Sequence, residues 1–183
     1  MSTVHRVRGL RLAEGGELLP DHAVAVTGGR FAAIGPYEEV LAQAGPHARV
    51  RAWDGVLAPG RYEPDAAALL EAAYYPDPRE AAELGTEPLT GEAPAALEMT
   101  DARWGGSARR GVQRLFAAGT TALSGTFTRP AVRTAVERSG IRVLPAPRPR
   151  PLVLTGAADF AVFADDGGAL VTVLGGRLVF RRS

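Results

Sequence analysis

Asp54-Gly55-Val56-Leu57-Ala58-Pro59-Gly60 overlaps the end of a strand predicted over residues 50–57, and two further strand-forming stretches lie near the other end of the chain. They are residues 156–163, Gly-Ala-Ala-Asp-Phe-Ala-Val-Phe, and residues 171–180, Val-Thr-Val-Leu-Gly-Gly-Arg-Leu-Val-Phe. Their apolar and β-branched residues predict strands over 158–163, 169–174 and 177–181. Because one β domain then takes strands from both ends of the chain, the middle is predicted to be an insertion.

The N-terminal part of this β domain has its own local signals. Residues 4–12 predict a strand, and residues 23–34 predict a hairpin that turns at Gly28-Gly29, since paired glycines tolerate positive φ angles. Residues 37–44 have the spacing of a short helix, which Gly45-Pro46 would end. About seven strands can close a β-sandwich. The predicted fold class is therefore α+β, with a small composite β-sandwich domain built from residues 1–62 and 151–183.

The insertion, residues 63–150, is predicted to be an α/β segment. Its second half, residues 102–150, follows the order helix (107–118), strand (120–123), helix (130–139) and strand (141–144). Its first half, residues 63–101, is acidic and partly loop. Four prolines and two glycines between residues 76 and 96 predict a long loop, or an extended chain that lies on a neighbour.

Residues 54–60 and the two C-terminal stretches resemble the composite β domain of the amidohydrolase superfamily of metal-dependent hydrolases. Residues 119–125, Gly-Thr-Thr-Ala-Leu-Ser-Gly, are similar to a strand and loop of imidazolonepropionases and aminodeoxyfutalosine deaminases. In that superfamily the Pro-Gly is followed by a His-x-His pair of metal ligands. An alignment without gaps places Asp65 and Ala67 at the two histidine positions.

The resemblance further implies a bridging lysine or carboxylate, two more histidines and a late aspartate as metal ligands. The sequence has no lysine, and His5, His22 and His47 all precede the motif. A carboxylate and a methyl group are a poor substitute for two imidazole nitrogens on zinc. We therefore expect no metal site and no cofactor.

Length supports the same interpretation. A complete (β/α)8 barrel takes about 250 residues, whereas only about ninety residues lie between Pro59 and the returning C-terminal strands. The insertion is predicted to resemble one to two repeats of a truncated barrel.

Composition limits the class of protein. Of the 183 residues, 46% are apolar, which is enough for a hydrophobic core. The absence of cysteine excludes disulfides and a thiolate nucleophile. No stretch has the ~20 apolar residues of a membrane span, so a cytoplasmic protein without membrane contacts is expected. Nucleic-acid binding is not expected, because the formal charge is +1 and the arginines are not matched by exposed aromatic residues.

Charge is unevenly distributed within the insertion. Residues 63–101 hold ten acids and one arginine, a balance of 1 − 10 = −9. Residues 103–150 hold ten arginines and one acid, a balance of 10 − 1 = +9. One interpretation is that the acidic segment folds over the basic one, or that both are ordinary solvated faces. The other is an arginine-lined anion site beneath an acidic, partly mobile cover.

Three groups of residues are candidates for a site. Glu63 and Asp65 could form a carboxylate pair for acid/base catalysis, or be two acids near a turn. Ser107 and Arg109 follow two glycines and could bind an anion at a helix N-terminus, or Ser107 could simply cap that helix. Ser124, Thr126 and Arg129 could line a pocket at the end of a strand, or Arg129 could help to start the helix at Pro130. The three histidines and Asp159 are expected to be structural.

These observations favour a reduced amidohydrolase relative that does not catalyse hydrolysis and that binds a protein partner or a small anionic or heterocyclic ligand. The alternative is a hydrolase of non-peptide carbon–nitrogen bonds, imidazolonepropionase-like or deaminase-like, whose site another chain completes. Metal-independent chemistry at Glu63, Asp65 and Arg129 is a third possibility. A broken barrel would expose a sheet edge and an apolar face, so a homodimer is expected to cover them.

Overall fold

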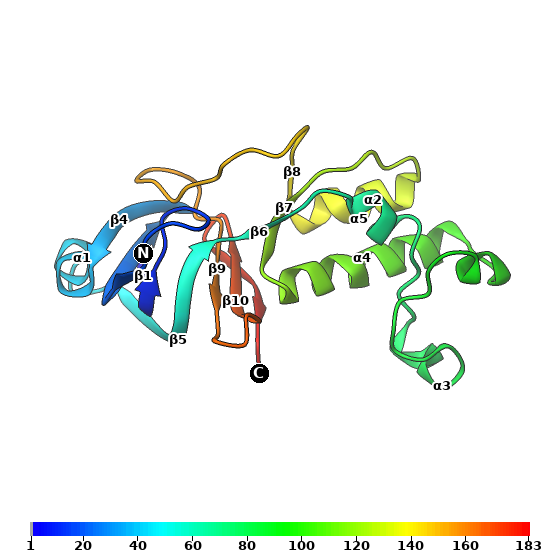
Figure 1. Cartoon of the computed structure of the whole chain (residues 1–183), viewed down its shortest axis with the longest axis horizontal. Helices are drawn as coiled ribbons and strands as arrows, with labels where there is room; N and C mark the ends of the chain where they lie inside the picture. Colours follow the sequence, from blue (N-terminus) through cyan, green and yellow to red (C-terminus); the bar gives the residue numbers. More distant parts are fainter. Residues whose placement is uncertain (1) are drawn as a thin grey trace. The chain divides into compact units, whose positions relative to one another are not determined.

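The computed structural model describes residues 2–183, which form two compact units. The first, here called the β domain, contains the chain up to Arg61 together with Phe116–Thr121 and Arg148–Ser183. The second, here called the helical unit, contains Tyr62–Leu115 and Ala122–Pro147. Both ends of the chain thus belong to one unit (Figure 1). The division predicted at residues 62 and 151 differs mainly in that Phe116–Thr121 belongs to the β domain.

A single eight-stranded mixed sheet forms the β domain. Its strands are β1 (Thr3–Leu10), β2 (Leu19–Pro20), β3 (His22–Thr27), β4 (Arg30–Pro36), β5 (Arg49–Pro59), β9 (Phe160–Phe163), β10 (Ala169–Leu174) and β11 (Arg177–Arg181). The order is β11-β10-β9-β5-β1-β3-β4, with β2 paired to β1, and the N- and C-terminal strands meet where β5 pairs with β9. The pairing of β1 with β5 is parallel and the others are antiparallel. The α+β class with a mixed sheet is confirmed, but the strands form one continuous sheet and not two separate ones.

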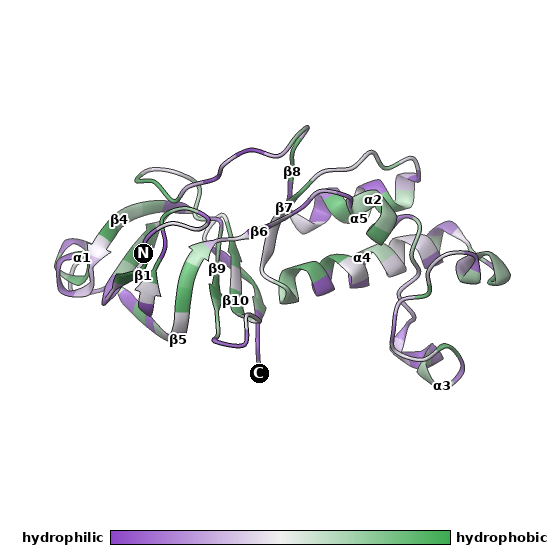
Figure 2. Cartoon of the chain, in the orientation of Figure 1, coloured by the Kyte–Doolittle hydropathy of each residue, from purple (hydrophilic) through white to green (hydrophobic). Residues whose placement is uncertain are grey.

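The sheet is curled, and hydrogen bonds join β4 and the β3–β4 turn to the segment that precedes β9. The Phe31 amide donates to the Gly156 carbonyl, and the Ala158 amide donates to the Gly29 carbonyl. These contacts enclose one apolar core with side chains from β1, β3, β4, β5, β9 and β10, and hydrophobic (green) segments are visible along these strands in Figure 2. Because the sheet is curled, each part of it covers the apolar face of another part, and no second sheet is needed to bury the core.

Strand β3 shows how the two faces of the sheet differ. Val24 and Val26 point into the main core, whereas Ala23 and Ala25 point to the opposite face and contact α1 (Tyr37–Ala44). This alternation is the period-2 pattern of a strand. The small alanines leave room for Val40, the buried residue of α1.

The predicted turn at Gly28-Gly29 is confirmed, and a second hairpin is also built on paired glycines. Gly28 and Gly29 join β3 to β4 with φ angles of 58° and 79°, and Gly175 and Gly176 join β10 to β11 with φ angles of 52° and 76°. The side chain of Asp159 accepts a hydrogen bond of 2.6 Å from the Gly175 amide. Asp159 therefore holds a hairpin turn, as expected for a structural residue.

The helical unit consists of short elements and two longer helices. Its elements are β6 (Arg61–Glu63), α2 (Ala66–Leu70), the 3-10 helix η1 (Pro78–Glu80), α3 (Ala81–Leu84), the 3-10 helix η2 (Ala93–Ala96), α4 (Asp101–Ala117), β7 (Thr120–Leu123), α5 (Pro130–Ser139) and β8 (Arg142–Val143), of which β6, α4 and β7 extend into the β domain. The three strands form a sheet in the order β6-β7-β8. β7 and α5 have the predicted bounds. The predicted loop at residues 76–96 instead contains η1, α3 and η2.

Arg150 joins the points where the chain leaves and re-enters the β domain. One guanidinium nitrogen donates to Thr121 Oγ1 at 2.7 Å, and the other donates to the Gly60 carbonyl. Gly60 follows β5, and Arg150 lies just after the return to the β domain. The two connections are therefore held side by side.

Candidate functional site

The predicted carboxylate pair lies at the end of β6. Glu63 is the last residue of that strand, and Asp65 is the N-cap of α2. Asp65 Oδ1 accepts a hydrogen bond of 3.3 Å from the Ala68 amide, and Glu63 Oε1 accepts one of 2.9 Å from the Asp65 amide. Both carboxylates thus bind backbone N–H groups of their own turn, which is how aspartate commonly starts a helix.

Ser124 fixes this turn to the end of β7. Its hydroxyl accepts from the Tyr62 hydroxyl at 2.7 Å and donates to the Pro64 carbonyl at 3.0 Å. Its backbone amide donates to the Glu63 carbonyl at 2.9 Å, and its carbonyl accepts from the Ala66 amide at 3.0 Å. The structure therefore brings Glu63, Asp65 and Ser124 together. The Ser124 hydroxyl proton is already donated to the Pro64 carbonyl.

The loop after Ser124 is held by a residue that the sequence did not single out. The Glu71 carboxylate accepts from the backbone amides of Thr128, at 3.0 Å, and Arg129. Burial alone would raise the pKa of Glu71, but these backbone donors outweigh it and lower the pKa. Arg129 is the N-cap residue of α5 without a side-chain cap, and its guanidinium lies 4.3 Å above the Trp104 ring. Thr126 is exposed.

Ser107 does not cap a helix, which corrects the sequence interpretation. α4 begins at Asp101, and Ser107 is buried within the helix, where its hydroxyl accepts from the Tyr75 amide at 2.9 Å. The start of the helix is instead marked by Thr100, whose Oγ1 accepts from the Arg103 amide at 3.3 Å. The proposed anion site at a helix N-terminus is therefore not formed at Ser107.

Glycines inside α4 explain the misplaced start. A Cβ at Gly105 would lie 3.5 Å from the Cβ of Ala131 on α5. A Cβ at Gly111 would lie 2.7 Å from Tyr75 and 2.6 Å from Leu70. Gly111 is therefore a packing position in the helix, whereas the contact at Gly105 is one that an alanine would also make. The cost of Gly111 in helix propensity, about 1 kcal/mol, is offset by its close contact with Tyr75 and Leu70.

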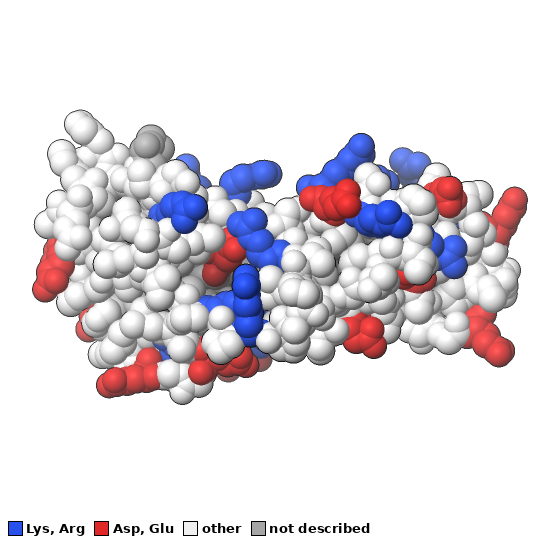
Figure 3. Space-filling view, turned by 90° about the horizontal axis from the view of Figure 1, so that it is seen from above, with Lys and Arg blue, Asp and Glu red and all other residues white. Residues whose placement is uncertain are grey.

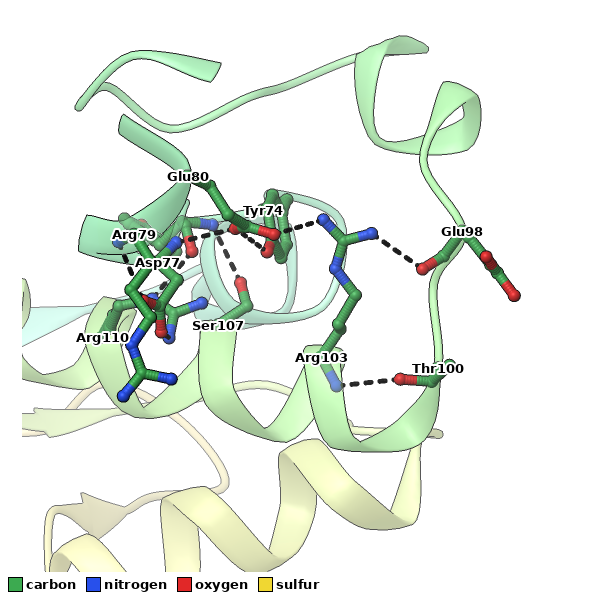
Figure 4. Close-up of polar contacts among 10 residues, drawn as sticks. Tyr74, Asp77, Arg79, Glu80, Glu98, Thr100, Arg103, Ser107 and Arg110 are labelled. Atoms are coloured by element: carbon green, nitrogen blue, oxygen red, sulfur yellow. Dashed lines mark hydrogen bonds and ion pairs between the residues drawn. The ribbon is translucent and has the colours of Figure 1, made fainter. Parts of the chain in front are cut away.

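The acidic segment lies against the basic helix. Figure 4 shows Tyr74, the Asp77 amide and Arg103 converging on the Glu80 carboxylate. Donation from the Tyr74 hydroxyl, then from the Asp77 amide, and then the Arg103 guanidinium lower the pKa of Glu80 to about 2. This arrangement agrees with the first interpretation of the charge pattern.

Further contacts extend this pairing along α4. Arg110 donates to the Tyr75 carbonyl at 2.9 Å and pairs with Asp77 at 3.2 Å, and Arg114 pairs with Glu87 at 3.4 Å. The two charge blocks of the sequence therefore become interspersed in space, as the face in Figure 3 shows. Arg109, the remaining candidate, is exposed on α4.

Two kinds of feature are absent from the described residues. Within residues 2–183, no group of three or more His, Cys, Asp or Glu side chains is arranged to hold a metal ion. None of the helices described in this range has both the length and the apolar character that a membrane span requires.

Comparison with known proteins supports the resemblance noted in the sequence. A family model described as the bacterial imidazolonepropionase-like composite domain matches residues 23–44, which cover β3, β4 and α1. Curated protein sequences gave no match.

Solved structures match over most of this chain. An adenosine deaminase from Xanthomonas campestris with bound zinc has a TM-score of 0.54 and 19% identity, over 78% of this chain and 33% of that one. An E. coli guanine deaminase has a TM-score of 0.56 and 15% identity, over 78% and 35%. An ochratoxinase from A. niger has a TM-score of 0.51 and 17% identity, over 78% and 30%. The chain spans about a third of the length of these structures and shares their fold.

Proposed function

We propose that this chain, whose fold is that of amidohydrolase-type deaminases and hydrolases, is a non-catalytic binding module derived from them. The proposal rests on the two positions where the resemblance implies histidine metal ligands, because both residues there have structural roles. Asp65 caps α2, and Ala67 is a residue of that helix. Neither position offers a metal ligand that is free of a structural task.

The size of the insertion supports a reduced barrel. Strands from both ends of the chain pair in one sheet, so residues 62–147 are enclosed within the β domain's sequence on both sides. A complete barrel of about 250 residues does not fit into that interval. We therefore propose that β6, α4, β7, α5 and β8 correspond to one to two barrel repeats, wherever the natural chain begins and ends.

The test is the metal content of the full chain after incubation with zinc, iron, nickel or manganese and gel filtration. A content near zero is expected, with no hydrolysis of adenosine or guanine. About one tightly held atom per chain would overturn the proposal. The Asp65→Asn variant would then show whether the metal depends on that carboxylate, with Asp54→Asn as the control for charge.

That result would favour the alternative function, a hydrolase of non-peptide carbon–nitrogen bonds. The solved structures that share the fold include two deaminases, one of them with bound zinc. In this case other ligands would have to come from another chain. Loss of metal on dilution to monomer, with retention at high protein concentration, would support such a shared site.

A homodimer is part of the proposal, together with a cytoplasmic location and the absence of a cofactor. β8 is an edge strand of the three-stranded sheet, and Val143 on it has 50% of its surface exposed. A second copy could cover this edge. Sedimentation should give a dimer that Val143→Glu weakens, whereas Val153→Glu, at a similarly exposed position in the β domain, should not change it. If the natural protein sediments as a monomer at all concentrations, the homodimer proposal is refuted.

A further inference from the structure

A groove of about 420 Å³ runs between α4 and α5 in the helical unit. Its floor includes Val112 and Ala135, which are buried. Its walls include three arginines, Arg109 and Arg110 from α4 and Arg138 from α5. The groove shares no lining residue with the cluster formed by Glu63, Asp65 and Ser124.

The three guanidinium groups differ in whether an acidic side chain neutralises their charge. Arg110 pairs with Asp77. For Arg109 and Arg138, no ion pair or hydrogen bond to another side chain is found within residues 2–183. Two unpaired positive charges that line one small groove with an apolar floor repel each other. A bound anion would relieve this repulsion.

Gly106 makes room for this cluster. A Cβ at this position would lie 3.3 Å from one guanidinium nitrogen of Arg110 and 3.8 Å from one of Arg109. The guanidinium groups of both arginines therefore lie over the glycine. A glycine inside a helix is unfavourable relative to alanine, and here its missing side chain keeps the space between the two arginines open.

We propose that this groove binds a small molecule with a doubly charged oxyanion, a phosphate monoester, whose apolar part rests on Val112 and Ala135. Planar guanidinium groups match the oxygens of phosphate and hold them with charge-assisted hydrogen bonds. The volume is that of a small-molecule site, and no aromatic side chain lines it for stacking nucleic-acid bases. The inference rests on the proposed function only in that the ligand is bound and released unchanged.

The experiment is a titration of the full chain with phenyl phosphate at constant ionic strength, followed by calorimetry and by NMR. Arg109→Gln and Arg138→Gln should each weaken binding roughly tenfold, the effect of losing one charge-assisted hydrogen bond. Arg133→Gln is the matched control, because it removes the same charge from an exposed position of the same helix, α5, but lies outside the groove. It should bind as the natural protein does.

A second variant separates binding from folding. Gly106→Ala should leave the melting temperature equal or higher, because alanine favours the helix and the three atoms nearest to the new methyl group belong to flexible arginine ends. It should nevertheless weaken binding of phenyl phosphate. Unchanged affinity in this variant would contradict the placement of the ligand over Gly106.

Other outcomes also decide. No saturable binding at millimolar phenyl phosphate, equal losses in Arg133→Gln, or tighter binding of an acidic peptide would overturn the phosphate-monoester site. Inorganic phosphate should bind more weakly than phenyl phosphate, and phenol should not compete; the reverse would refute the role of the apolar floor. Recovery of phenol would show that the ligand is hydrolysed, which would defeat the non-catalytic proposal while leaving the groove in place. If phenyl phosphate does not bind and the protein also holds no metal, the groove proposal fails while the non-catalytic proposal stands.

Discussion

His5 should make the stability of the β domain depend on pH between about 6.5 and 4. Its side chain is 1% exposed. Burial, and secondarily the charge of Arg51, lower its pKa from 6.5 to about 4. The neighbouring rings fit a neutral imidazole, because Trp53 Nε1 donates to Nδ1 at 3.1 Å and the Phe160 ring meets His5 edge-on at 5.1 Å.

The sign follows from the two protonation equilibria. Above pH 6.5 the imidazole is neutral in both states, so its effect on stability is constant. Between pH 6.5 and 4 only the unfolded chain binds the proton, and the free energy of unfolding falls as the pH falls. Below about pH 4 both states are protonated and the loss ends. A shift of about 2.5 pKa units at 1.36 kcal/mol per unit gives a loss of about 3 kcal/mol.

The assay is urea unfolding of the natural protein and of His5→Gln at a series of pH values across this range. Glutamine does not titrate, and its amide oxygen can still accept from Trp53. Carboxylates such as Glu80 also lose stabilising contacts in acid, but they are common to both proteins and cancel in the difference. The natural protein should lose about 3 kcal/mol more than the variant. Parallel curves for the two proteins would refute the reasoning, and His5→Phe provides a second non-titrating reference.

Three further predictions follow from single contacts. Tyr74→Phe removes the first donor to Glu80, so the pKa of Glu80, which its contacts hold at about 2, should rise toward 4.5. NMR titration of the Glu80 carboxyl carbon measures this pKa. An unchanged pKa would count against the network in Figure 4. Thr172→Val removes a buried hydrogen bond of 2.6 Å to the Phe116 carbonyl and should lower the free energy of unfolding by about 1 kcal/mol, with a neutral effect contradicting it. Gly60→Ala would place a Cβ 2.3 Å from Thr121 Oγ1 and should cost roughly 1–3 kcal/mol in urea unfolding, unlike Gly106→Ala, and a stability equal to the natural protein's would refute that clash.

Elements with strong end signals were predicted with their bounds. α1 ends at Gly45, which has a φ of 82°, and α5 begins with Pro130 and ends at Gly140 in the left-handed conformation. These residues act locally, so their effect can be predicted without the fold. The start of α4 was not predicted, because Gly105 and Gly106 disfavour a helix locally, whereas this part of α4 is fixed by long-range contacts such as that of Ser107 with Tyr75, 32 residues away.

The candidate site was predictable to the same degree. The position of Asp65 after the Pro-Gly turn follows from the family resemblance, but its grouping with Ser124 was not predicted, because it depends on β6 and β7 being neighbours in one sheet. Glu71 and Tyr62 were missed because their partners are 57 and 62 residues away in the sequence. The curl of the sheet was also missed, since strand periodicity specifies which face is apolar but not how far a sheet bends.

The clamp formed by Arg150 makes the β domain tolerant of changes in what lies between its halves. Arg150 after the insertion donates directly to the Gly60 carbonyl before it, so this contact can hold the two ends of the insertion together whatever the length between them. Closing a longer or shorter connection between two fixed neighbours changes the free energy only slowly, by about 0.6 kcal/mol for each doubling of its length. Whole barrel repeats can therefore be lost or gained in evolution while the surrounding domain keeps its fold, and the same junction is the natural place to graft a different segment.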